Sequence, residues 1–398
     1  MTKAVTFDNT LAFAQNLIRI PSPSGHEGEV AALVRYEMES LGFRDIRTDE
    51  VGNVIGVVPG AGTAPAVLLN SHMDVVAEGD HREWEYPPFA AEVADGYLHG
   101  RGAMDIKGPL AIQTYAAAAL AGRAPGDVIV AHTVFEERGG LGMKYLMESG
   151  TVTPGAVVIG EATHGDICIG HRGRGEIEVV IRGVAGHASA PDRACNALDL
   201  VPGVLDVVAE FSRGQAEDPV LGASTIVATG LDVLPESRNV IPDRVTVVLD
   251  WRVLPDIGTE AMTKCVREAL SARLGTVNEE FAIDVSMAME SQCTYTGRTH
   301  ERDLFTPGFL MDPSDPFVRV AASAVGRRSG EGPAVVRPWT FATDGGWSYG
   351  VFGIPTVGFA PGEERFAHTN RERLELDEAR WVFERYPDLV LGLQQALT

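Results

Sequence analysis

Apolar and polar positions alternate in two distinct patterns along the first part of the chain. Apolar residues recur at helical spacing over residues 11–20 and 27–41, and the second run stops at Gly42, as a helix with a glycine cap would. Short apolar runs bounded by Gly, Pro and Asn predict buried strands at residues 54–58 and 66–71. The next predicted elements are a helix at 108–122, a strand at 127–135, a helix at 141–149 and a strand at 156–160. Alternating strands and helices predict a doubly wound α/β sheet with helices on both faces.

The middle of the chain has a different order of elements. The pattern there predicts a strand at 177–182, a helix at 196–211, strands at 224–229 and 244–253, a helix at 259–274 and a strand at 281–287. This β-α-β-β-α-β order is a complete ferredoxin-like unit. From residue 316 onward the first pattern returns, so we expect a mixed-sheet domain over residues 1–175 and 290–398 with a ferredoxin-like domain, residues 176–289, inserted into it.

Composition excludes several classes of protein. A chain of 398 residues is long for a single core, which agrees with two domains. The formal net charge of −22 and the lack of a lysine or arginine run argue against binding of nucleic acid or of an anionic membrane surface. The four cysteines have no CxxC spacing and are expected to be reduced thiols. With neither a signal-peptide pattern nor an apolar stretch of membrane-spanning length, we expect a cytoplasmic protein.

Possible metal ligands fall where predicted strands end. His72 and Asp74 follow the strand at 66–71, Glu136 and Glu137 follow the strand at 127–135, and Glu161 follows the strand at 156–160. Ligand sites in open α/β sheets gather at the carboxyl ends of strands. We therefore expect these side chains to meet at one place.

Two further residues extend this set. Asp105 lies in a glycine-rich segment before a predicted helix, and His368 follows a predicted strand at 355–359. Histidine with carboxylate ligands suits zinc, and a shared carboxylate suits a pair of metal ions. Each residue alone could be a helix cap or a solvated loop residue. The adjacent carboxylates of Glu136 and Glu137 would repel each other in a cleft without a cation, so the whole set favours a metal site.

The spacing of His72 and Asp74 has a meaning of its own. Residues two apart in an extended segment share a face, so Asp74 can hold the second ring nitrogen of His72 and fix its tautomer. The alternative is an exposed loop pair.

These motifs resemble the M20 metallopeptidases, a family that includes acetylornithine deacetylase, succinyl-diaminopimelate desuccinylase, aminoacylase-1 and glutamate carboxypeptidase. The blocks that carry the resemblance are Ser-His-Met-Asp at 71–74, the glycine-rich segment 100–108, Glu136-Glu137, Gly-Glu-Ala at 160–162 and His368. The resemblance implies that Asp105 bridges two divalent ions, zinc in the first place with cobalt or manganese as alternatives. It implies His72 and Glu161 on one ion, Glu137 and His368 on the other, and Glu136 as general base, with Asp74 in a catalytic supporting role.

The inserted domain adds further matches to that family. The segment around His187 resembles one whose histidine enters the partner subunit's active site and stabilises the oxyanion, which implies a homodimer formed through this dimerisation or lid domain. The resemblance implies that Asn239 contacts substrate and that Arg252 binds the substrate carboxylate. His187 could instead be a turn residue, and Arg252 could simply pair with Asp250 or Asp256.

One block departs from the family pattern. His368 is followed by Thr-Asn-Arg-Glu, whereas Gly-Ala-Asn-Glu is common there, which puts the neighbouring substrate pocket in doubt more than metal binding. Trp347 and Phe359 either line that pocket or belong to the core.

The resemblance thus implies a hydrolase that uses two metal ions to cleave an amide bond beside a free carboxylate, in a small N-acyl amino acid or short peptide. We expect an N-acyl amino acid deacylase, with an M20 dipeptidase or carboxypeptidase as the alternative, and an inactive small-molecule binding relative as the alternative from another class. Nucleotide binding is disfavoured because neither a GxGxxG turn nor a phosphate-binding loop is present.

Overall fold

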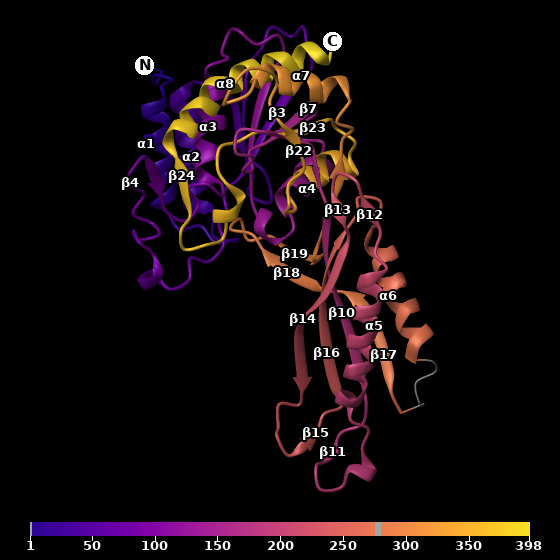
Figure 1. The fold of residues 1–398 in the computed structure, drawn as a ribbon. Helices are drawn as coiled ribbons and strands as arrows, with labels where there is room; N and C mark the ends of the chain where they lie inside the picture. Colours follow the sequence, from indigo (N-terminus) through magenta and orange to yellow (C-terminus); the bar gives the residue numbers. More distant parts are fainter. Residues whose placement is uncertain (1, 275–279) are drawn as a thin grey trace. The chain divides into compact units, whose positions relative to one another are not determined.

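The computed structural model describes residues 2–274 and 280–398, which divide into two compact units (Figure 1). The first unit comprises Met1–His171, Gln292–His300 and Phe309–Thr398, and the second comprises Arg172–Ser291 and Glu301–Gly308. Residues 275–279 of the predicted inserted domain lie outside the described residues. The domain limits drawn from the sequence stay a prediction.

The first unit is built on an eight-stranded mixed sheet, so the predicted α/β class is confirmed. Its central strands β6, β3, β7 and β23 are mutually parallel, whereas β1, β2 and β6 are joined by antiparallel pairing. In spatial order the strands are β1 (Arg44–Thr48), β2 (Val54–Val58), β6 (Val128–Thr133), β3 (Val67–His72), β7 (Ala156–Ile159), β23 (Thr356–Gly358), β8 (Ile167–Cys168) and β22 (Val336–Arg337).

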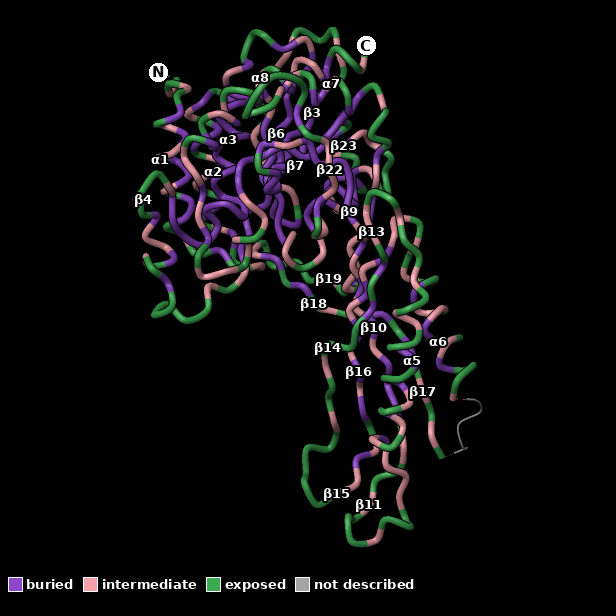
Figure 2. Tube along the Cα trace, viewed as in Figure 1, coloured by how far each residue is buried: buried purple, intermediate pink, exposed green. Residues whose placement is uncertain are grey.

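Helices cover both faces of this sheet, and the central strands are apolar because each face is buried (Figure 2). Successive side chains of β3 point to opposite faces: Val67 and Leu69 join one cluster, and Leu68 joins the other. The first cluster takes in helices α1 (Phe7–Ile18), α2 (Gly28–Leu41), α3 (Lys107–Ala118), α7 (Pro316–Val325) and α8 (Leu376–Ala396). The second takes in α4 (Leu141–Glu148) and the π-helical turn Gly346–Val351. Truncation of Leu68 to alanine should therefore cost roughly 2–5 kcal/mol.

The second unit has the predicted β-α-β-β-α-β order, and the ferredoxin-like class is confirmed. Its elements are β10 (Gly173–Arg182), α5 (Val201–Arg213), β14 (Thr225–Leu234), β16 (Arg244–Val253), α6 (Thr259–Leu274) and β17 (Ala282–Met287). The strands lie antiparallel in the order β14-β16-β10-β17, and the short β20 (Phe305–Thr306) also pairs with β10. Alternate residues of β10 are buried with α5 and α6 in one core. The edge strand β14 is mostly exposed (Figure 2).

Several short elements have no counterpart in the apolar pattern. A small sheet of β4 (Glu92–Ala94), β5 (Tyr97–His99) and β24 (Arg373–Glu375) joins distant parts of the chain. The hairpin β18 (Met289–Cys293) and β19 (Thr299–Asp303) is likewise polar. Helix α1 begins at Phe7, earlier than predicted, because the Thr6 hydroxyl caps it by accepting from the Asn9 amide. Among the described residues, every helix is too short or too polar to cross a membrane.

Candidate metal centre

Three adjacent strands of the first unit deliver side chains to one edge of the sheet. Strands β6, β3 and β7 run parallel, so their carboxyl ends lie together. His72 is the last residue of β3, Glu136 and Glu137 lie in the turn directly after β6, and Glu161 follows β7. The structure therefore brings together the strand-end residues singled out from the sequence.

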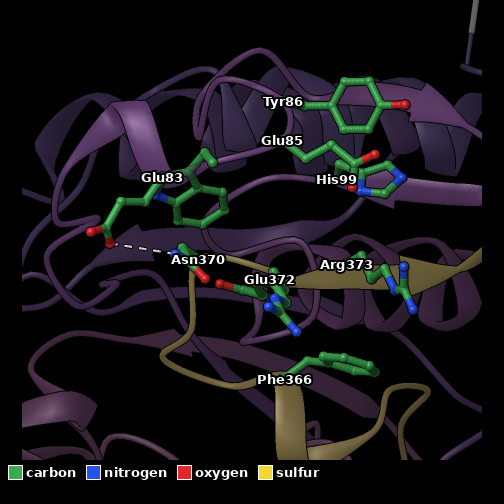
Figure 3. Close-up of a pocket in the computed structure, with 10 residues that line it drawn as sticks. Glu83, Glu85, Tyr86, His99, Phe366, Asn370, Glu372 and Arg373 are labelled. Carbon is green, nitrogen blue, oxygen red and sulfur yellow. Dashed lines mark hydrogen bonds between the residues drawn. The ribbon is translucent and has the colours of Figure 1, made fainter.

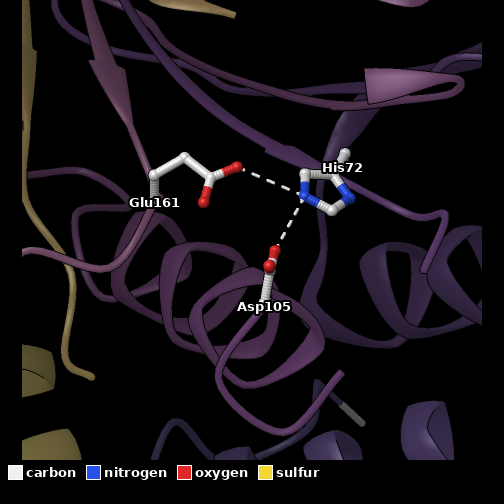
Figure 4. A group of neighbouring side chains, drawn as sticks. All are labelled: His72, Asp105 and Glu161. Atoms are coloured by element: carbon white, nitrogen blue, oxygen red, sulfur yellow. Dashed lines mark ion pairs between the residues drawn. The ribbon is translucent and has the colours of Figure 1, made fainter. Parts of the chain in front are cut away.

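A buried group forms around His72 (Figure 4). The Nε2 atom of His72 lies 3.3 Å from Asp105 Oδ1 and 3.2 Å from Glu161 Oε1. All three residues are buried, with at most 9% of the surface of any one exposed. We call His72, Asp105 and Glu161 the buried triad.

A second group shares Asp105 and faces solvent. The Nε2 atom of His368 lies 3.2 Å from Asp105 Oδ2 and 3.1 Å from Glu137 Oε2, and the His368 side chain is 53% exposed. We call Asp105, Glu137 and His368 the open triad. Asp105 thus directs one carboxylate oxygen to each histidine, as a bridging ligand must.

The geometry of both triads fits a pair of zinc-type ions. Two atoms each about 2.0–2.1 Å from one zinc ion at the tetrahedral angle lie roughly 3.3 Å apart, close to the separations above. The His72 Nε2 atom is buried and makes no hydrogen bond to any of the described residues. A buried nitrogen without a hydrogen bond, faced by carboxylates, is a suitable ligand.

The pKa shifts of the carboxyl groups also indicate that cations would stabilise this site. Burial raises the pKa of Glu161 to about 7 and the pKa of Glu136 well above its ordinary value, and neighbouring carboxylates add to both shifts. The pKa of Glu137 is raised by burial and by Asp105. Four carboxyl groups crowded at one sheet edge are costly to ionise together without cations.

The pKa values of the two histidines are also raised, which favours the charged form of each ring. Burial lowers the pKa of His72, but Asp105, Asp74 and Glu161 outweigh burial and hold the pKa well above its usual value. Asp105 and Glu137 raise the pKa of His368 to about 10. Burial raises the pKa of Asp105, but His368 and His72 outweigh it and the net shift is downward. Ring protons therefore balance the carboxylates, and metal ions bound at these residues would displace those protons.

Asp74 supports the site in a way that the sequence did not predict. The closest partner of His72 Nδ1 is the backbone carbonyl of Asp74 at 2.8 Å, whereas the nearer carboxylate oxygen is 3.5 Å away. The Asp74 carboxylate instead accepts the backbone N–H of Glu136 at 3.1 Å and of Glu137 at 3.2 Å. The Ser24 hydroxyl donates to the same carboxylate at 2.7 Å. Asp74 thus fixes both the ring of His72 and the turn that carries the paired glutamates.

Glu27 completes this support and was missed from the sequence. It is fully buried, and its Oε1 accepts the backbone N–H groups of Gly25 at 3.0 Å and Phe135 at 3.4 Å. Burial, followed by the charge of Asp74, raises the pKa of Glu27 to about 8. Phe135 itself has a positive φ of 55°, a conformation unfavourable for a bulky residue. A single glutamate before a helix gives no sequence signal for such a role.

Glu372 holds the turn that carries Asp105 and was also missed. Its carboxylate accepts the backbone N–H groups of Met104 and Asp105, each at 3.0 Å, and pairs with Arg101 at 2.5 Å. Burial raises the pKa of Glu372 to about 7. Buried backbone N–H groups need partners, so this carboxylate stabilises the glycine-rich turn in one conformation.

The remaining predicted site residues lie in the second unit. His187 is exposed in β11 (Gly186–His187), where its Nδ1 lies 2.7 Å from the Ser189 hydroxyl. Asn239 is exposed and precedes β15 (Val240–Ile241), the strand that pairs with β11. Arg252 lies in β16 and pairs with Asp250 at 2.8 Å, the scaffolding contact that the sequence left open.

The two aromatic residues considered for the pocket are both buried. Phe359 packs against Trp381 and Tyr386 within the first cluster and is a core residue. Trp347 donates from its indole nitrogen to the Gly139 carbonyl at 3.1 Å, beside the turn that carries Glu136 and Glu137.

Comparisons with known proteins agree with this geometry. Residues 68–390 match the Peptidase_M20 family, described as peptidase family M20/M25/M40. The chain is 31% identical over 366 residues to the Escherichia coli protein YgeY, covering 91% of this chain and 88% of YgeY. It is 28% identical over 421 residues to succinyl-diaminopimelate desuccinylase of Methylorubrum extorquens, covering 95% of this chain and 98% of that enzyme.

A solved structure shares the fold over nearly the whole chain. The M20 family metallo-carboxypeptidase of Sulfolobus solfataricus superimposes with a TM-score of 0.73 at 18% identity, covering 98% of this chain and 100% of the other. The resemblance seen in the sequence is confirmed. The chain therefore belongs to the M20/M25/M40 peptidase family, whose members are metallohydrolases that cleave C–N bonds.

Proposed function

We propose that this protein is a dinuclear zinc hydrolase that cleaves the amide bond of an N-acyl amino acid beside its free carboxylate. The observation that carries the proposal is the position of Asp105, which offers one oxygen to the buried triad and the other to the open triad. His72 and Glu161 would hold one ion, and Glu137 and His368 the other. Bound ions of this kind polarise a carbonyl oxygen and lower the pKa of water.

Glu136 is the group that moves protons in this proposal. It lies beside the buried triad, with Oε2 3.9 Å from His72 Nε2, and burial raises the pKa of its carboxyl group, which strengthens it as a base. Glu136 accepts a proton from the attacking water and returns it to the leaving nitrogen. Asp74 and Glu27 keep its backbone in place through the hydrogen bonds described above.

Support for an acyl amino acid substrate comes from relatives and from the second unit. Relatives 28% identical over more than 90% of this chain are named succinyl-diaminopimelate desuccinylases. Arg252 offers a planar guanidinium for a substrate carboxylate, in exchange for part of its pairing with Asp250. Asn239 is proposed as a second substrate contact. The second candidate is a dipeptidase or carboxypeptidase, because solved structures with these names share the fold of this chain. At their low identity the likeness extends to the fold alone.

A metal assay combined with a substrate panel tests the proposal. Purified protein should hold two zinc-type ions and release free amine from N-acyl amino acids faster than from dipeptides. Glu136→Gln should keep both ions while turnover falls about 10²- to 10⁴-fold. Glu148→Gln, at an exposed position on α4, is the matched control and should retain normal turnover.

Each contrary outcome has its own meaning. Preferred cleavage of dipeptides would favour the peptidase, and a protein with neither metal nor turnover would favour a binding relative. A near-normal rate for Glu136→Gln would remove Glu136 from the role of base.

We also propose that the enzyme works as a homodimer through the second unit. The edge strand β14 leaves one side of its sheet unpaired in the described chain and exposes Val227, Leu231 and Leu234, features expected of an interface. In that dimer the exposed His187 would stabilise the oxyanion in the partner's active site.

Mixed dimers test the shared site directly. His187→Ala and Glu136→Gln should each be almost inactive alone. A mixture that exchanges subunits should recover up to about a quarter of wild-type turnover, because half of the dimers carry one intact composite site. Absence of recovery, with subunit exchange verified by a tag, would contradict the role of His187 across the interface.

A further inference from the structure

The segment that carries Glu136 and Glu137 is an irregular turn that joins β6 to α4. We call residues 134–142 the glutamate turn. Phe135, Gly139 and Gly140 all have positive φ, so neither the strand nor the helix continues through it. Backbone N–H and C=O groups outside regular pairing need other partners. The side chains that supply those partners therefore decide where the two glutamates lie.

Asn53 holds the two ends of the glutamate turn together. It is fully buried, its Oδ1 accepts the Val134 N–H at 3.1 Å, and its Nδ2 donates to the Gly142 carbonyl at 2.9 Å. A Cβ at position 142 would lie 2.4 Å from Asn53 Oδ1, so only glycine leaves room for the amide. One side chain thus fixes both the entry and the exit of the turn.

Gln292 holds the middle of the turn from a different part of the chain. It is buried in β18, and its Nε2 donates to the Arg138 carbonyl at 2.7 Å. Arg138 directly follows Glu137 in the sequence. The hairpin tip 292–300 belongs to the first unit, whereas the chain on both sides of it belongs to the second. The turn is therefore tied to the hairpin at which the chain passes between the units, labelled β18 and β19 in Figure 1.

The same hairpin tip also supports Asn53. The Tyr295 hydroxyl donates to the Gly52 carbonyl at 2.7 Å. Gly52 directly precedes Asn53, and a Cβ on it would lie 2.4 Å from the Tyr295 ring. The tip thus contacts the glutamate turn through Gln292, and it contacts the loop that carries Asn53 through Tyr295.

The other expected metal ligands have different supports. Glu372, which lines the cavity of about 360 Å³ drawn in Figure 3, accepts the Asp105 N–H. His72 is the last residue of β3, and Glu161 follows β7. A change at Gln292 should therefore act on the glutamate turn and leave the buried triad in place.

From these contacts we infer that Gln292 is a positioning residue for both paired glutamates, acting through the Arg138 carbonyl. The inference rests on the proposed function, in which Glu136 moves the proton and Glu137 binds the ion of the open triad. A catalytic group misplaced by about 1 Å can lose on the order of 10² in rate, so one hydrogen bond to the adjoining backbone matters. Loss of a residue that supports a metal ligand typically weakens metal binding about 10- to 100-fold.

Gln292→Met tests the inference, because methionine keeps the length of the side chain and removes the amide donor. In the metal-loaded enzyme, kcat for an N-acyl amino acid should fall about 10- to 100-fold. KM should be unchanged, because the substrate-binding groups proposed above lie outside the turn.

Zinc titration of the full-length protein after metal removal gives a readout that does not depend on turnover. The binding step that His368→Gln removes identifies the ion of the open triad. In Gln292→Met that ion should bind about tenfold more weakly, because Glu137 lies on the loosened turn. The ion of the buried triad should keep its affinity, because its ligands lie outside the turn.

Gln394→Met is the matched control. Gln394 is also fully buried in the first unit, and its Nε2 donates to the Gly126 carbonyl at 2.8 Å, at the opposite end of β6 from the glutamate turn. This variant should keep normal kcat and both zinc affinities, even if its stability falls. Gln292→Glu is a second test variant of the same shape. Its carboxylate is an acceptor that would face the Arg138 carbonyl, so the open-triad ion should be weakened further.

The outcomes separate the inference from the proposed function. The inference is overturned if the open-triad ion keeps its affinity in Gln292→Met, if both ions are weakened equally, or if Gln394→Met has the same effect. If Gln292→Met fails to fold, Gln292→Glu is judged by the same criteria. A wild-type protein without amide turnover, whose open-triad ion is still selectively weakened by Gln292→Met, would refute the proposed function alone.

Discussion

The buried triad and the open triad share Asp105 but differ in their surroundings. His72 and Glu161 are enclosed at the end of the central strands β3 and β7, where the sheet fixes their backbones. His368 lies on a loop, has a positive φ of 60° and is half exposed. Similar ligand chemistry is thus supported by rigid strands on one side and by a loop on the other. The buried triad is therefore held by more of the surrounding structure than the open triad.

Removal of the shared carboxylate should have the largest effect, because it disables both triads. Asp105→Asn keeps the shape of the side chain but removes the charge that faces His72 and His368. We expect loss of both ions and a fall in turnover on the order of 10³-fold or more. Metal analysis and amine release measure the two effects, with the exposed Asp377→Asn as the control. Two retained ions would show that Asp105 is not a bridge.

Removal of the histidine should lower the unfolding free energy of the protein by different amounts in the two triads. In the metal-free protein, His72→Ala leaves the buried carboxylate of Glu161 without its cation and Asp105 with His368 alone, which should cost roughly 3–5 kcal/mol of unfolding free energy. His368→Ala removes a half-exposed partner and should cost about 0–1 kcal/mol. Urea unfolding measures both, with His81→Ala at an exposed ion pair as the control. Equal losses would abolish the distinction between the triads.

The pH dependence of metal-free stability should distinguish the two triads by the pH range in which stability falls. The pKa of Glu161 is raised from 4.5 to about 7, so its stabilising contribution is lost as the pH rises through that range. The pKa of His368 is raised from 6.5 to about 10, and its contribution is lost as the pH rises through the higher range. Glu161→Gln should remove the first loss and His368→Gln the second. Thermal unfolding from pH 5 to 10 checks both, and unchanged profiles in the variants would contradict the assignment.

Much of the fold followed from the sequence because its core strands and helices carry their own apolar signal. Strands β2 and β16 and helix α6 lie at the predicted residues, since each buries a regular set of side chains. The strand-end argument also brought His72 and Glu161 together, because parallel neighbours end at one edge. Strands β5 and β24 could not be predicted, because each is three residues long and they pair across a long separation in sequence.

The supporting residues of the site escaped prediction for a different reason. Glu27 and Glu372 act by accepting backbone N–H groups from segments far away in the chain. A carboxylate in such a role looks like any other surface glutamate in a sequence. Asp74 was singled out, but its main bonds go to the backbone of Glu136 and Glu137, which no spacing rule indicates.

Glu372 and His368 lie late in the sequence, so they are translated after the other residues of the site. This order matters for how the site is completed. His72, Asp105 and Glu161 all leave the ribosome well before residues 368–372, which supply the histidine of the open triad and the carboxylate that holds the Asp105 turn. In the proposed two-ion site, the nascent chain would therefore still lack His368, and the Asp105 turn would still lack its contact with Glu372. The open triad is complete only after that segment has been translated.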